Sequence, residues 1–180
     1  MSIKASKNFS FSKSSEAIGT IVARTLNKMA RHLNASIQKG IDTSTDIHGN
    51  KFKRLSEDST LPIRNKRKHG FTPLDTMQTT ASGRQSSRSL RATRITTAKP
   101  KDLFRGMTSK IRMVQDHGLF HNEGFVTGKT SMIPNKKVEK REWFGIPKDF
   151  RDGGKDYKKY VAEIERMIMS DLRIPTKTIK

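Results

Sequence analysis

The 180-residue chain contains no cysteine. This absence excludes a disulfide scaffold, a cysteine-based zinc site and a thiol nucleophile. Hydrophobic residues make up only 32% of the chain, below the roughly 45–50% apolar content of ordinary globular proteins. No apolar run approaches the roughly 20 residues of a membrane span, and the stretch Met1–Asn8 lacks the apolar segment of a secretory signal. We therefore expect a modest core, with part of the chain extended or ordered by partners.

Basic residues are in large excess, and they are unevenly distributed. The chain has 37 Lys and Arg against 17 Asp and Glu, a net charge of +20. Residues 61–115 hold thirteen basic and two acidic residues, so this third carries more than half of the excess. Such a surface attracts polyanions or acidic protein faces. The charge alone fits nucleic acid, a membrane surface or an acidic assembly partner.

Two amphipathic helices are predicted, one near each end of the chain. Over residues 16–39 the apolar residues recur at spacings of three and four, which is the pattern of one helix face. Ser14 or Ser15 can cap its start, and Gly40 is well placed to end it. The same spacing begins again at Lys155 and predicts a second helix that Pro175 ends. The expected core residues are Ile18, Val22, Leu26, Leu33, Ile37, Phe52, Leu55, Trp143, Phe144, Ile164 and Ile168.

Between the helices the pattern changes to short strand candidates. Residues around 88–98 and 107–115 predict a hairpin across Lys99–Asp102, and residues 118–126 are a third candidate. We therefore predict an α+β fold in which the two helices pack on a small antiparallel sheet, with extended arms and loops. The predicted organisation is a flexible N-terminal arm (1–14), a single α+β domain (15–173) and a basic C-terminal tail (174–180).

No group of residues forms a recognisable reactive site. His117 and His121 are four residues apart, but Gly118 stands where a metalloprotease helix carries its glutamate. The stretch Asp42–Asn50 lacks the ligand spacing of a calcium loop. Gly124–Thr130 superficially suggests a phosphate-binding loop, but only three residues separate its glycines. We therefore expect no catalytic, cofactor-binding or metal-binding residues, and we do not expect an enzyme.

The order of five short segments resembles a known family. It is similar to the virion morphogenesis or tail-completion proteins of tailed bacteriophages, which act at the neck where head meets tail. Each segment is short, and the resemblance rests on their occurring in one order across about residues 16–172. The segments are Gly40-Ile41-Asp42 after the first helix, Gly49–Leu55 like "G-x-x-F-x-x-L", Thr72–Thr76 like "P-L-x-x-T-G", His121–Gly124 like "H-N-x-G", and Arg141–Ile146 like "R-x-F-x-G".

This resemblance implies a structural virion protein that completes the tail or neck and enables head-tail joining. Its implied partners are copies of itself in a ring, six-fold by expectation, neighbouring neck, connector or tail proteins, and non-specific DNA in the channel, with no membrane and no cofactor. It implies location in the virion, and in the host cytoplasm during assembly. His121, Asn122 and Gly124 are expected to shape a turn. The expected interface residues are Lys66, Arg67, Lys68, Arg84, Arg88 and Arg91.

A second interpretation comes from the charge alone. A basic nucleic-acid-binding module, either ribosome-associated or DNA-binding, would also carry runs of Arg and Lys. It predicts tight binding to RNA or DNA that weakens steeply with salt, because phosphate contacts release counterions.

Overall fold

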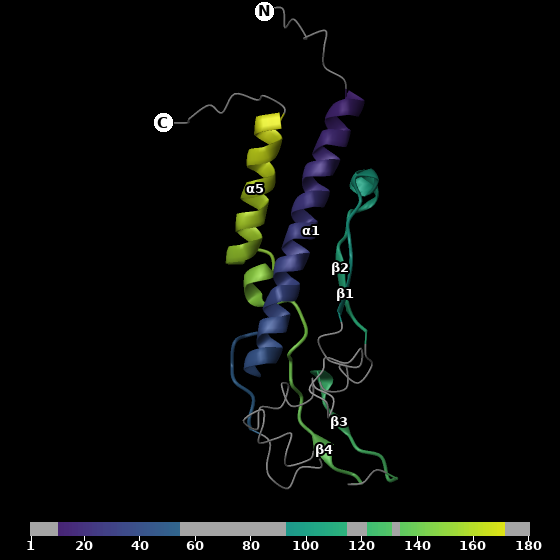
Figure 1. Ribbon diagram of the computed structural model, residues 1–180, viewed down its shortest axis with the longest axis vertical. Helices are drawn as coiled ribbons and strands as arrows, with labels where there is room; N and C mark the ends of the chain where they lie inside the picture. The colour runs from purple at the N-terminus through teal and green to yellow at the C-terminus, as the bar shows by residue number, and fades with distance from the viewer. Residues whose placement is uncertain (1–10, 55–92, 115–121, 131–133, 172–180) are drawn as a thin grey trace, which may run out of the picture. The chain divides into compact units, whose positions relative to one another are not determined.

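The computed structural model describes residues 11–54, 93–114, 122–130 and 134–171. Helix α1 (Phe11–Thr43) comes first and helix α5 (Lys155–Asp171) comes last, with two small sheets between them (Figure 1). The predicted fold class is confirmed: the chain is α+β, with an N-terminal helix, a C-terminal helix and a small set of antiparallel strands.

Helix α1 is longer at its start than the sequence predicted. It begins at Phe11, so residues 11–14 are helical, although they were assigned to the arm. The hydroxyl of Ser15 donates a hydrogen bond to the carbonyl of Ser12 at 2.9 Å, inside the first turns. The predicted cap at Ser14 or Ser15 is therefore wrong, because both residues already lie within the helix. The wider division into arm, domain and tail stays a prediction, since residues 1–10 and 172–180 lie outside the described residues.

The end of α1 also lies beyond the predicted position. Ser44 has a left-handed backbone, with φ at 49°. Its N–H donates to the carbonyl of Ile41, and the N–H of Thr45 donates to the carbonyl of Gly40 at 2.9 Å. These two bonds form a Schellman motif, which satisfies carbonyls that the last turn leaves without helical partners. Ser44, and not Gly40, therefore marks the end of the helix.

The first sheet is the predicted hairpin. Strands β1 (Thr93–Thr96) and β2 (Lys110–Met113) pair, and both alternate between half-buried and exposed side chains. The link between them is longer than the predicted four-residue turn. It contains a 3-10 helix, η1 (Pro100–Arg105), which ends at Gly106 with φ at 87°. Only Gly adopts that conformation without strain, so this residue sets the turn back into β2.

The second sheet was not predicted as a separate element. Strand β3 (Phe125–Val126) pairs antiparallel with β4 (Lys137–Val138), with Phe125 opposite Val138. The sequence placed residues 118–126 in one sheet with the hairpin, and this is wrong for the described strand. Two-residue strands carry little alternation, so their pairing partner is not visible in the sequence. A short 3-10 helix, η2 (Lys148–Phe150), precedes α5.

The chain divides into two compact units, and helix α1 contributes to both. We call them the tip unit, which contains the loop end of the hairpin, and the tryptophan unit, which contains Trp143. The tip unit is Met1–Arg31, Ile95–Lys110 and Asp149–Lys180, and the tryptophan unit is His32–Arg94 and Ile111–Lys148.

The tryptophan unit has a small apolar core. Ile37 and Ile41 lie one helical turn apart on α1 and are buried together with Trp143, which is 1% exposed. The rings of Trp143 and Phe144 meet edge to face, with centroids 5.6 Å apart. The partly buried residues around this core are Leu33, Phe52, Met113 and Phe144.

In the tip unit the most buried positions of α1 are small residues. Gly19, Ala23, Thr25 and Ala30 are buried. The expected core residues Ile18, Val22 and Leu26 are half-buried instead. Ile164 and Ile168 of α5 are also half-buried, whereas Tyr160 is buried. At Gly19 the absence of a side chain lets the backbone of Pro100 approach the helix closely.

Ile41 has no exposed surface, so shortening it should destabilise the tryptophan unit. We expect Ile41→Ala to lower the free energy of unfolding by about 2–5 kcal/mol, through lost transfer energy and a cavity. Ile146→Ala is the matched control, because Ile146 is 52% exposed, and it should change stability by less than about 0.5 kcal/mol. Urea unfolding of both variants measures this, and equal losses would contradict the assignment of the core.

Candidate interaction surfaces

Asn27 fixes the hairpin of the tip unit to α1. Its side-chain amide donates to the carbonyl of Ala98 at 3.1 Å, and its side-chain oxygen accepts the N–H of Ala98 at 2.7 Å. One amide therefore satisfies both polar groups of one peptide residue, as a neighbouring strand would. Ala98 is buried, so these groups have little access to water as an alternative partner. The exchange fixes the position where β1 leads into η1.

Gly19 gives the same loop room to approach the helix. A Cβ atom at Gly19 would lie 2.8 Å from the carbonyl oxygen of Pro100, closer than real Cβ contacts allow. A glycine inside a helix loses about 1 kcal/mol relative to alanine, and here the close approach explains its presence. Gly19 and Asn27 are eight residues apart on α1, which places them on the same face.

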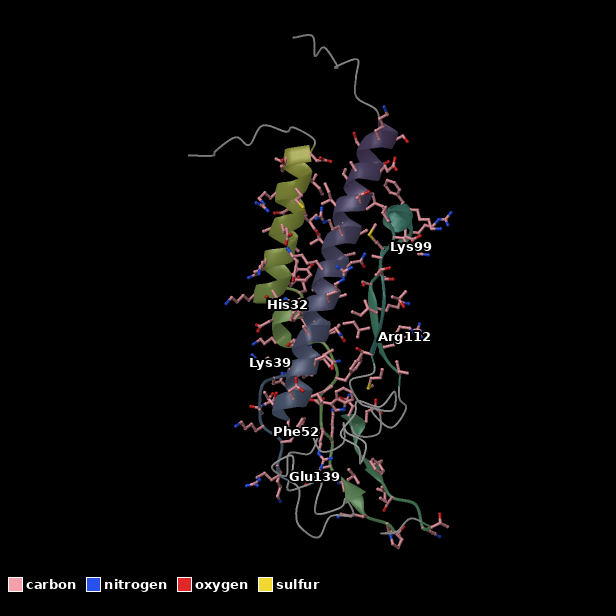
Figure 2. The ribbon with its side chains drawn as sticks, viewed as in Figure 1. His32, Lys39, Phe52, Lys99, Arg112 and Glu139 are labelled. Atoms are coloured by element: carbon pink, nitrogen blue, oxygen red, sulfur yellow. The ribbon has the colours of Figure 1, made fainter. Side chains whose placement is uncertain are left out.

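The loop held in this way presents cations and one exposed ring. Lys99, Lys101 and Arg105 are exposed, and Lys99 lies at the loop end of the hairpin (Figure 2). The one acidic residue of η1, Asp102, is half-buried, and its N–H donates to the carbonyl of Lys99. Phe104 is 77% exposed. We call Lys99, Lys101, Phe104 and Arg105 the basic tip.

Helix α5 contacts the first part of α1 in the tip unit through a polar pair. The ammonium of Lys28 lies 2.7 Å from a carboxylate oxygen of Glu163 and 6.0 Å from the ring centroid of Tyr160. The hydrogen bond from Lys28 lowers the pKa of Glu163, whereas burial raises the pKa of Tyr160. The pair is exposed to solvent, so it orients α5 more than it stabilises the unit.

The tryptophan unit brings together segments that are far apart in the sequence. The N–H of Ile47 donates to the carbonyl of Glu142 at 2.8 Å. The N–H of Phe144 donates to the side-chain oxygen of Asn122 at 2.9 Å. Gly145 lies against Ile47, since a Cβ atom there would be 3.3 Å from the Cδ1 of that residue. We call these contacts around Trp143, together with the apolar core of the tryptophan unit, the motif cluster.

Gly124 shapes the backbone next to Asn122. Its φ is 78°, and a Cβ atom there would lie 2.9 Å from both the carbonyl oxygen of Val138 and the backbone nitrogen of Lys140. Side chains other than hydrogen are therefore excluded for two reasons, the conformation and the space. Asn122 is helical, Gly124 follows with a left-handed backbone and leads into β3, and His121 lies outside the described residues.

The loop after α1 is closed by Asp46. One carboxylate oxygen accepts the N–H groups of His48 and Asn50, and the other accepts the side-chain amide of Asn50 at 2.9 Å. Gly49 provides the left-handed turn, with φ at 89°. Burial opposes ionisation, but the hydrogen bonds from Asn50 and His48 prevail and lower the pKa of Asp46. The carboxylate therefore acts as a turn-closing acceptor.

The predicted interface residues cannot be placed. Lys66, Arg67, Lys68, Arg84, Arg88, Arg91 and the predicted core residue Leu55 all lie outside the described residues. The sequence reasoning missed Gly19, Asn27 and Phe104. A glycine and an asparagine inside an amphipathic helix were the available signals, because both residues disfavour a helix interior. The exposure of Phe104 had no sequence signal, since an aromatic residue beside an apolar one also fits a core.

Within residues 11–54, 93–114, 122–130 and 134–171, no group of three or more His, Asp or Glu side chains is arranged to hold a metal ion. The helices of this part of the chain include none that is long and apolar enough to cross a membrane. Comparisons with protein-family models, curated proteins and solved structures gave no match for this chain.

Removing the Asn27 side chain should release the hairpin loop from α1. We expect Asn27→Ala to leave the N–H of Ala98 without its acceptor, at a local cost of about 1–3 kcal/mol. Amide hydrogen exchange at Ala98 should then be roughly five- to 150-fold faster. Arg24→Ala changes an exposed residue of the same helix and should leave that rate unchanged. Unchanged protection in Asn27→Ala would show that the clamp does not hold the loop.

The hydrogen bonds to Asp46 predict a pH dependence of one sign. Because its pKa is lower in the folded protein than in the unfolded chain, its contribution to stability is present above the unfolded value, near 3.8. The contribution is lost as the pH falls through the folded value. An NMR titration of the Asp46 carboxyl should have a midpoint below 3.8, and Asn50→Ala should raise it. A midpoint that does not move in Asn50→Ala would contradict this origin of the shift.

Proposed function

We propose that this protein is a structural component of a tailed-phage virion that completes the tail or neck and enables head-tail joining. The observation that supports this most is the motif cluster. Four of the five segments that resemble the family's patterns contribute to one packed group. These segments are residues 40–42 at the end of α1, 49–54 with Phe52, 122–124 with Asn122, and 141–146 with Trp143.

Convergence of this kind has weight because the segments are widely separated. About a hundred residues lie between Ile41 and Trp143, yet both side chains belong to one buried cluster. The fifth segment, Thr72–Thr76, lies outside the described residues.

The proposed role relies on binding and shape, without catalysis. A ring subunit around a channel presents surfaces to its neighbours, and its partners stabilise it by mass action. Few side chains among the described residues are fully buried, and α1 is long; both features suit a subunit completed by assembly. Copies of the chain in a ring, six-fold in this proposal, and adjacent neck or tail proteins would supply the missing contacts.

The second candidate is a nucleic-acid-binding module. The net charge of +20 and the exposed basic tip favour it. The two functions differ in the strength of DNA binding. A neck subunit must let DNA pass, whereas a dedicated binding module holds its nucleic acid through many phosphate contacts and releases it steeply with salt.

The first test is the mass of the purified full chain in solution, at low and high salt, with and without duplex DNA. We expect a multimer larger than a dimer, with its mass unchanged by DNA at physiological salt, because assembly depends on protein contacts. Light scattering measures both quantities. A monomer that binds DNA tightly and loses it steeply with salt would instead establish the nucleic-acid module.

A charge-reversal variant gives the same test a matched control. We expect the triple variant Arg84→Glu, Arg88→Glu, Arg91→Glu to stay folded by circular dichroism and to have a monomer mass. The control triple Lys129→Glu, Lys136→Glu, Lys137→Glu makes the same change of net charge at exposed positions and should keep the multimer. If the arginine triple still forms the multimer, these three arginines are not part of the interface between subunits.

A further inference from the structure

We propose that the basic tip, comprising Lys99, Lys101, Phe104 and Arg105, is a DNA-contacting element. In this proposal the three cations contact backbone phosphates, and the Phe104 ring lies against a base that is unpaired, as in a single strand. The inference names a contact for the DNA that the proposed function includes, and in that respect it rests on the proposed function.

The tip is held in place before any partner binds. Asn27 exchanges two hydrogen bonds with Ala98, directly before the tip, and Gly19 lies against the backbone of Pro100 within it. Gly106 ends η1 in the left-handed region. The loop therefore presents its side chains from a fixed backbone, which lowers the entropy lost on binding.

The ring of Phe104 distinguishes this loop from an ordinary solvated basic turn. The ring is 77% exposed, although the loop that carries it is fixed to α1. Its exposure therefore belongs to one defined loop conformation and does not come from a flexible segment. The charged side chains are well hydrated and need no partner, whereas an exposed aromatic ring gains free energy when it is covered. An aromatic ring flanked by cations combines the two features that proteins use on nucleic-acid strands, phosphate contact and stacking.

The surroundings of Phe104 favour DNA over a pocket in another protein. An aromatic anchor of a protein interface is normally surrounded by further contacts that exclude water. Its neighbours in the tip, Lys101 and Arg105, are instead exposed and charged. A polyanion can pair with the cations of the tip, and the positive net charge of the chain attracts it from a distance.

Three contacts also fit a strand that has to move. The slope of log K against log salt is about −0.9 for each phosphate neutralised on duplex DNA, so three cations account for a slope of only about −2.7. The contact that one subunit makes is therefore weak, and a single tip would touch DNA without retaining it.

The test compares full-chain variants with matched charge. The tip triple Lys99→Ala, Lys101→Ala, Arg105→Ala and the control triple Lys155→Ala, Lys158→Ala, Lys159→Ala each remove three exposed cations of the tip unit. Fluorescence anisotropy with short duplex DNA and with oligo-dT measures binding from about 50 to 200 mM NaCl. We expect the tip triple to bind at least about tenfold more weakly than the control triple at low salt. On duplex DNA, the slope of log K against log salt should be smaller in magnitude by about 2.7.

The ring is tested separately from the charges. Phe104→Ala should weaken binding to oligo-dT by at least about fivefold, the lower range for loss of one stacked base, and should leave the salt slope unchanged. Val126→Ala, at another exposed apolar residue, should change neither. No effect of Phe104→Ala would overturn the stacking contact and favour an acidic protein face as the partner of the ring.

Two results separate this proposal from the proposed function. Equal losses in the two triple variants would show that only net charge attracts DNA and would overturn the tip as the contact, even if the chain assembles as a ring. A chain that remains a monomer, yet loses DNA only in the tip triple, would retain the tip and remove the neck role.

Discussion

The position of the loop between β1 and β2 depends on the exchange of two hydrogen bonds between Asn27 and Ala98. An isolated two-stranded sheet is marginally stable in water, and it needs a partner surface to persist. Helix α1 provides such a surface in each of the two units. In the tip unit Asn27 and Gly19 hold the loop, and in the tryptophan unit Asn34 accepts a hydrogen bond from Thr93 at 2.8 Å. Polar and small residues of α1 therefore help to place the hairpin, together with Met113 of β2, which packs against the apolar core of the tryptophan unit.

The tryptophan unit solves a related problem with a different device. Its strands β3 and β4 are too short to define a sheet alone. Backbone groups instead bind across segments, from Ile47 to Glu142 and from Phe144 to the side chain of Asn122. These bonds surround Trp143, the largest fully buried side chain of the described residues. A core this small needs such cross-links, because burial of a few side chains barely offsets the entropy of ordering the loops.

The two helices and the hairpin could be predicted because each repeats a pattern over several residues. The apolar spacing of α1 and α5 and the alternation of Lys110 to Met113 are local signals, and the structure follows them. The pairing of β3 with β4 could not be predicted, because two residues carry no period. The burial of Ala23 and Ala30, with Val22 and Leu26 only half-buried, depends on which neighbours α1 meets in the fold and not on the local apolar spacing. Likewise, nothing in the residues around Phe104 separates an exposed ring from a buried one, because exposure depends on the tertiary fold.

In the neck role proposed above, a strongly basic subunit at a DNA channel would have to reconcile attraction with passage. A surface with many phosphate contacts gains affinity with each one and would retain the strand. Concentrating the DNA contact in a fixed tip limits how many cations meet the strand at once. The remaining positive charge is then available for acidic faces of neighbouring subunits, where charge complementarity speeds encounter and sets the register. On this argument the rigidity of the Asn27 clamp matters more for function than the size of the charge, because a flexible basic loop could follow the strand and add contacts that a fixed one cannot.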